Sequence, residues 1–270
     1  MKQLAATACM TLLAAATLAA PAHAGVHYRA HTAIDGAQAA GQTMEVEAWV
    51  DGPNAKVLFA ESDNPILGAG TYLLSNDGGE TLYLVNPEEK TYALLDLGSM
   101  MAGAGAMMKG LGPMMKISFS NQKVEKLAEE AGPPILGYAT THYRFRTVYD
   151  SEIKVMGMGQ SSHNDTTTDT WSTAELTDAG FAAWLRREPP RTGIADLDEM
   201  IGNEVRKGIR GVPLKVVAVS KVKDQRGRET ATTTTMEVTA IRKEAVPPES
   251  FAMPKGYEQI ELMPAMPGRP

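Results

Sequence analysis

The sequence predicts a mainly β protein, an α+β fold built from antiparallel strands with a smaller helical part. Several short segments alternate polar and apolar residues with a period of two, which is typical of strands that bury one face. Turn sequences such as Asp77-Gly78-Gly79 separate these segments. Near the C-terminus, runs of Thr and Val favour strands over helices.

The first predicted strands form a hairpin that continues as a meander. The turn at residues 51–54 joins QTMEVEAWV (42–50) to AKVLFAE (55–61), so these segments are expected to pair. Glu45 and Glu47 point to one face of the first strand, and the other face carries Met44, Val46, Ala48 and Val50. Three further segments continue the meander: GTYLLSN (70–76), ETLYLVN (80–86) and KTYALLDL (90–97).

The later strands flank a helical insert. In residues 137–146, Tyr143 and Phe145 alternate with cationic side chains, so the aromatic face is expected to point to the core. Residues 165–176 are expected to be a strand, and the next two segments form a late hairpin, 213–224 with 228–242. Residues 176–208 carry two apolar stripes at helical spacing, separated by Pro189-Pro190, and predict two helices.

Residues 1–24 are expected to be a cleaved signal peptide. Lys2 precedes an apolar run from Leu4 to Ala20, and a small-residue cleavage site ends at Ala24. The mature chain, 25–270, is expected to form a single domain. Loss of Lys2 from 26 basic residues leaves 25 against 32 acidic ones, a net charge of about −7.

Charge and cysteine content restrict the class of protein. A net charge of −6 for the whole chain argues against nucleic acid as a partner, because phosphate binding needs a basic face. Cys9 is the only cysteine and lies in the predicted signal peptide, so the mature chain has no thiol. These features suit export to the oxidising periplasm of a Gram-negative bacterium.

Residues 98–116, GSMMAGAGAMMKGLGPMMK, form a Met/Gly-rich insert in which methionine pairs repeat every seven residues. On a helix this spacing places the methionines on one side, although the glycines and Pro113 disfavour an isolated helix. Such a strip suits plain core or plug packing, a lid over a hydrophobic ligand that faces Trp49 or Trp184, or a Cu(I) site. The candidate ligand-binding residues are Met100, Met101, Met107, Met108, Leu111, Met114 and Met115.

The sequence contains no catalytic signature. His27 and His31 have a spacing that can chelate a metal on a helix, but a frayed terminal segment is the favoured interpretation. His163 precedes Asp165 and Asp169, yet no nucleophile motif accompanies it, and a solvated loop is expected. No phosphate-binding glycine motif is present. We therefore expect neither an enzyme nor a cofactor or metal site.

A family resemblance rests on segments spread over residues 40–262. They are EVEAWVDGPNAKVLFAES, GETLYLVNPEEKTYALLD, GYATTHYRFR, TDTWSTAEL, PLKV and the closing PPESFAMPKGYEQIEL. In this order they resemble the LolA-like family of exported bacterial proteins, and most of all its uncharacterised periplasmic relatives. The resemblance implies an incompletely closed antiparallel β-barrel, a half-barrel, wrapped around a few helices with an apolar cavity between them.

The resemblance and the methionine strip together predict a function. We expect a non-enzymatic periplasmic protein that binds a lipid, a lipoprotein acyl chain or another hydrophobic ligand in the half-barrel. Its expected partners are that ligand or a lipidated protein, with transient contact to the cell envelope and no nucleic acid. Two alternatives stay open: a Met-rich copper-handling protein, and an envelope-assembly protein that docks a partner through the strip.

Overall fold

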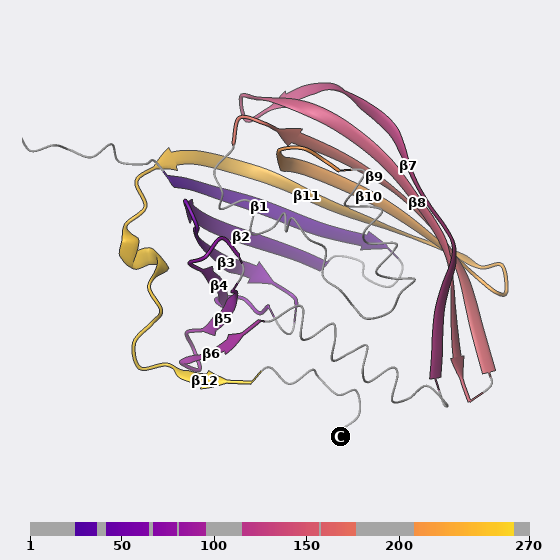
Figure 1. Cartoon of the computed structure of the whole chain (residues 1–270), viewed down its shortest axis with the longest axis horizontal. Coiled ribbons are helices and arrows are strands. Elements are labelled where there is room, and N and C mark those ends of the chain that lie inside the picture. Colours follow the sequence, from indigo (N-terminus) through magenta and orange to yellow (C-terminus); the bar gives the residue numbers. More distant parts are fainter. Residues whose placement is uncertain are drawn as a thin grey trace, which may run out of the picture.

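The computed structural model is shown in Figure 1, and it describes residues 25–36, 42–64, 67–79, 81–95, 115–156, 158–176 and 208–261. The predicted signal peptide and nearly all of the Met/Gly-rich and helical inserts lie outside these ranges. Within them the secondary structure is almost entirely strand, with one short 3-10 helix, η2 (Pro248–Phe251). No helix in the described part of the chain is long and apolar enough to cross a membrane.

The strands form one open sheet. In chain order they are β1 (Gly25–Gly36), β2 (Gln42–Asp51), β3 (Asn54–Ser62), β4 (Tyr72–Ser75), β5 (Tyr83–Asn86), β6 (Thr91–Leu94), β7 (Met115–Ile135), β8 (Tyr138–Val155), β9 (Met158–Thr173), β10 (Val212–Asp224), β11 (Glu229–Glu244) and β12 (Glu258–Ile260). Their order across the sheet is β12-β6-β5-β4-β3-β2-β1-β11-β10-β9-β8-β7, so β12 and β7 are its edges. Every pair is antiparallel except β12 with β6. The predicted incompletely closed antiparallel architecture is confirmed.

Strand β1 joins the two halves of the sheet. It pairs with β2 on one side and with the late strand β11 on the other. The sequence analysis expected a frayed terminal segment around His27 and His31, and this prediction is wrong. The segment GVHYRAHTAI alternates small or polar residues with apolar ones, and both edges of the strand find a partner.

Strand β7 is an edge strand that the sequence analysis did not assign. It pairs with β8 along most of its length, interrupted by three register shifts. Residues 123–130 are rich in Lys, Glu, Leu and Ala, which favour helices, so the local sequence does not predict a strand. Charged side chains and bulges on an edge also hinder pairing with another chain.

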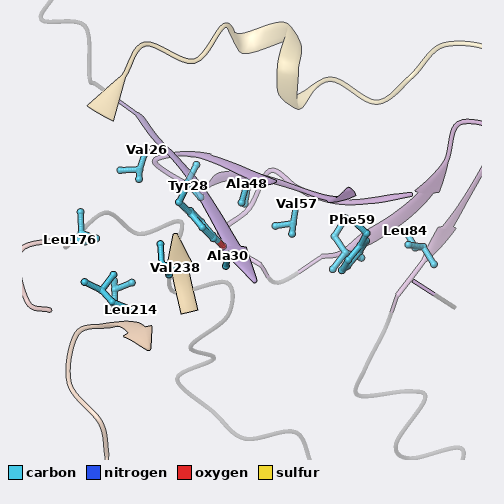
Figure 2. Close-up of a cluster of buried hydrophobic side chains, with 14 residues drawn as sticks. Val26, Tyr28, Ala30, Ala48, Val57, Phe59, Leu84, Leu176, Leu214 and Val238 are labelled. Carbon is cyan, nitrogen blue, oxygen red and sulfur yellow. The ribbon is translucent and has the colours of Figure 1, made fainter. Parts of the chain in front are cut away.

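The main hydrophobic core lies on one face of the sheet, here called the inner face. Its buried side chains come from strands β1 to β5, from β10 and β11, and from Leu176 just after β9, as Figure 2 shows for ten of them. Ala48 and Val50 are fully buried, and Met44 and Val46 pack against this cluster, as the alternation in the first hairpin predicted. The largest fully buried side chains are Phe59 and Leu214 on this face and Leu74 on the other.

The opposite face, called the outer face, has a smaller apolar cluster where the C-terminal segment crosses it. Val246 and Phe251, the latter in η2, are buried with Leu74 of β4. Trp49 and Tyr72 are partly buried against them. The chain then returns to pair β12 with β6.

The junction between β9 and β10 requires a glycine. Gly211 has φ of +85°, a region that side chains with a Cβ rarely adopt. A Cβ at Gly211 would also lie 2.3 Å from the backbone oxygen of Thr173. The backbone of the β9 end therefore approaches too closely for any other residue.

A Gly211→Ala variant is expected to lower the free energy of unfolding by more than about 2 kcal/mol, because both the positive φ and the contact with Thr173 oppose a methyl group. Gly78→Ala is the matched control, since Gly78 has φ of +77° but nothing within 4 Å of its Cβ position. It should lose only about 1 kcal/mol. Urea unfolding measures both variants, and equal losses would contradict the steric explanation.

Candidate binding face

The inner face continues beyond the buried core as two rows of side chains that cross the sheet. The strand registers place each residue of a row opposite its neighbour on the next strand. The first row is Tyr143, Thr170, Val216, Met236, Thr32 and Met44. The second row is Phe145, Thr168, Ala218, Thr234, Ile34 and Gln42.

The two rows are uncharged and only partly covered. Tyr143, Phe145 and Thr170 are buried, whereas the members on β1, β10 and β11 are half-buried. Met44 and Met236 also pack against the main core cluster, so the rows are continuous with it. Thr and Val fill much of this surface because β-branched side chains suit strands, and their methyl groups give it an apolar character.

The outer face carries the charges of the same strands. The outer row that lies between the two inner rows contains Arg144, Asp169, Val217, Thr235, Ala33 and Thr43. On β8, His142 and Arg146 lie on this face beside Arg144, as predicted. Successive residues of a strand point to opposite faces, so the alternation in the sequence separates charge from apolar surface across one layer of sheet.

His142 is at the centre of one outer-face cluster. Its ring stacks on Trp171, with 4.7 Å between the ring centroids. Nε2 lies 2.6 Å from Asp169 Oδ1 and Nδ1 lies 3.2 Å from Glu130 Oε1. A neutral imidazole has a single N–H, so only the imidazolium donates to both carboxylates. Arg144 Nε donates a second hydrogen bond to Asp169 Oδ1 at 2.7 Å.

His27 forms a second cluster of the same design. Its ring stacks on Trp49 at 5.0 Å, and its two nitrogens lie 2.8 Å from Glu47 Oε1 and 3.1 Å from Glu244 Oε1. Trp49 therefore faces the opposite side of the sheet from the main core. The methionines that Trp49 was suggested to face lie outside the described residues, apart from the start of β7 at Met115.

The basic partners set the protonation of the carboxylates. Burial by itself raises the pKa of Asp169, but hydrogen bonds and charge from Arg144 and His142 outweigh it, so the pKa lies below its ordinary value. The pKa of Glu47 is lowered in the same way, with Arg29 and His27 outweighing burial. These carboxylates are held ionised by fixed partners, an arrangement that stabilises the sheet.

His163 was expected in a solvated loop, and this prediction is wrong. It lies within β9, where Nδ1 is 2.6 Å from Asp150 Oδ1 of β8. Hydrogen bonds from Asn121 and His163 lower the pKa of Asp150. Asp165 instead accepts hydrogen bonds from Arg146, which lower its pKa.

The described residues offer no obvious place for a metal. Among them, no group of three or more His, Cys, Asp or Glu side chains is arranged to hold an ion. Ring nitrogens of four histidines instead pair with carboxylates of neighbouring strands: His27, His31, His142 and His163. The candidate methionines 100, 101, 107, 108 and 114, with Leu111, lie outside the described residues. Met115 begins β7, where its backbone pairs with Val155.

The sequence analysis did not identify the inner rows as a candidate site. Their threonines were recognised only as strand formers, because no local motif marks them as a surface. The available signal was the spacing of the charged residues. Asp165 and Asp169 are an even number of residues apart in β9, and Lys215 and Glu237 lie opposite each other on β10 and β11. Only the register between strands aligns these positions on one face.

An Asp169→Asn variant is expected to lose about 1–3 kcal/mol of unfolding free energy at pH 7. Because the folded pKa is lowered, the stabilisation is complete above the unfolded pKa of about 3.9 and disappears as pH falls through the folded pKa. The difference between wild type and variant should therefore narrow as pH falls from about 5 to below 4.

Chemical denaturation across this pH range measures the difference. Glu130→Gln is the control, since Glu130 contacts the same histidine but its side chain is 66% exposed. It should change stability little at any pH. A pH-independent loss for Asp169→Asn, or an equal loss for Glu130→Gln, would contradict the assigned role.

Comparison with known proteins places the chain in a family. No curated protein matches it. Among solved structures it is similar to a LolA superfamily protein from Nitrosomonas europaea, with 11% identity, a TM-score of 0.34 and coverage of 86% of this chain and 91% of that one. That protein belongs to the superfamily that the sequence resembles, but the likeness is too distant to indicate a ligand or a site. The family model of a domain of unknown function, DUF4412, matches residues 61–257. This is more than half of the chain, which therefore belongs to the DUF4412 family.

Proposed function

We propose that this protein is a non-enzymatic binding protein that holds a hydrophobic ligand, such as a lipid or a lipoprotein acyl chain, on the inner face of its open sheet. One observation carries the proposal: the two inner rows are uncharged across six strands, whereas the outer row between them contains Arg144 and Asp169. In these rows of the six strands, charge therefore lies on the outer face only. The next strand, β7, adds Lys126 on the inner side, where its Nζ lies 5.7 Å from the Tyr143 ring centroid and pairs with Glu129.

The chemistry of the inner rows suits an acyl chain. Burial of each CH₂ group against apolar surface is favourable by about 0.8 kcal/mol, and an unpaired charge near it would oppose that gain. The half-buried Ile34, Val216 and Met236 supply apolar contacts, and the intervening threonines present short methyl groups. Ligand sites are commonly apolar surfaces of this kind with few polar groups.

The candidate methionines remain part of the proposal as a second, adaptable wall of the site. Unbranched thioether side chains repack around irregular shapes more readily than branched ones. Met115 is the one member in the described part of the chain, at the start of edge strand β7.

Location in the periplasm is also proposed. Residues 1–24 have the pattern of a cleaved signal, and no cysteine follows Cys9. A carrier of hydrophobic ligands there would move them through water between membranes. The charged outer face would stay in contact with that water.

A Thr234→Lys variant is expected to weaken binding of the fluorescent fatty acid cis-parinaric acid at least about tenfold, because it places a charge in the second inner row. Thr235→Lys is the matched control: it adds the same charge one residue away on the outer face, opposite Val217. Fluorescence titration compares them, and circular dichroism checks that each retains its sheet. Equal affinities of the two variants would contradict a site on the inner face.

Replacing Met100, Met101, Met107, Met108, Met114 and Met115 with Ser should abolish retention of the same fatty acid while the β-type circular dichroism spectrum persists. The reason is the loss of dispersion contact from the proposed second wall. Retention at the wild-type level would restrict the site to the sheet and remove the methionines from it.

A further inference from the structure

The hydroxyl of Thr170, in β9, is buried and unpaired. Thr170 is 1% exposed, and its Oγ1 has no hydrogen-bond partner among the described residues. Nearly all buried polar groups in folded proteins form a hydrogen bond, and a missing one costs free energy. Two other hydroxyls of β9 do have partners. Thr166 Oγ1 donates to Ser220 Oγ at 3.0 Å. Ser172 Oγ donates to the backbone oxygen of Arg210 at 2.6 Å. The unpaired hydroxyl is therefore specific to the position of Thr170.

This position belongs to the first inner row. The neighbours of Thr170 in that row are Tyr143 of β8 and Val216 of β10. Tyr143 is buried, whereas Val216 is half-buried, so the covered hydroxyl lies at the margin of the accessible part of the row. A ligand atom that enters between these two side chains would reach Oγ1.

The two ends of the row differ in charge. Beyond β8, register places Glu129 opposite Tyr143 and Lys126 opposite Phe145, and these two charged side chains form an ion pair. An acyl chain is disfavoured beside such groups, because they need water or polar partners. The other direction is uncharged and half-buried through Val216, Met236, Thr32 and Met44. From β9 to β2 this path crosses four inter-strand steps, about 19 Å at about 4.8 Å each. That distance is comparable with the length of a long extended acyl chain.

We propose that Thr170 binds the carbonyl oxygen of an acyl lipid, while the hydrocarbon chain lies along the first inner row toward β2. The hydroxyl has one hydrogen to donate, and a carbonyl or carboxylate oxygen accepts it. An oxygen-free hydrocarbon would leave the hydroxyl unpaired, so the site distinguishes acyl lipids from plain hydrocarbons. This inference rests on the proposed function, to which it adds the orientation of the ligand and the residue that selects it.

Fluorescence titration tests the proposal with three probes: cis-parinaric acid, its methyl ester, and diphenylhexatriene, a hydrocarbon without oxygen. Wild type should bind all three. Thr170→Val removes the hydroxyl with little change in shape. It should weaken binding of cis-parinaric acid at least about fivefold and leave binding of diphenylhexatriene unchanged. Thr170→Ser keeps a hydroxyl and should keep the preference for the acid. An equal loss for the ester would assign the site to acyl carbonyls in general, and a loss for the acid alone would assign it to free fatty acids.

The matched control is Thr167→Val, the same substitution three residues away on the outer face of β9, opposite Arg146 and Val219. It should leave all three affinities unchanged. Stability gives an independent readout in protein refolded from urea to remove co-purified lipid. Because the hydroxyl is unpaired without ligand, Thr170→Val should leave the urea midpoint unchanged or raise it. A lowered midpoint would show that the hydroxyl has a structural partner, and it would overturn the proposal.

The titrations separate this inference from the proposed function. Wild type that binds none of the probes overturns both. If wild type binds them and Thr170→Val loses no affinity, or loses it equally for all three, the role of Thr170 is overturned and the proposed function stands.

Discussion

The pairing of β1 with both β2 and β11 is the interaction on which the rest of the structure depends. Other neighbours in the sheet are also neighbours along the chain, except for β12 with β6. Without β1, the first meander, β2 to β6, and the second, β7 to β11, would share no hydrogen-bonded edge. The strand also sets the faces, because Val26, Tyr28 and Ala30 enter the main core while His27 and Arg29 point outward. A slip of one residue would exchange these faces.

The register of this one strand has consequences on both sides of the sheet. On the outer side it brings His27 between Glu47 and Glu244, from the two strands that flank it. On the inner side it brings Thr32 and Ile34 into the uncharged rows. The polar clusters stabilise the layer from outside, and the two inner rows remain without charge from β8 to β2. We propose that this division allows a single sheet to be soluble on one side and to hold a hydrophobic ligand on the other.

The local parts of the fold could be predicted from sequence, and the long-range parts could not. The first hairpin, the meander and the late hairpin follow from period-two alternation and turn residues, which act over a few positions. Strand β1 was missed because one of its two partners, β11, lies far along the chain, and β7 because Lys and Glu on an edge strand have the composition of a helix. His163 was expected in a loop because the residues around it, 161–165, are all polar and show no alternation. The methionine strip, by contrast, was visible in the sequence and lies almost wholly outside the described residues.

The most direct test of the central claim is to identify what the inner face holds. The protein should be purified from periplasm without detergent and extracted with organic solvent, and the extract analysed by mass spectrometry beside that of an unrelated exported protein. The account predicts a lipid or other acyl-bearing molecule at close to one equivalent, absent from the control. An extract that matches the control, from protein that also fails to take up added fatty acid, would contradict it.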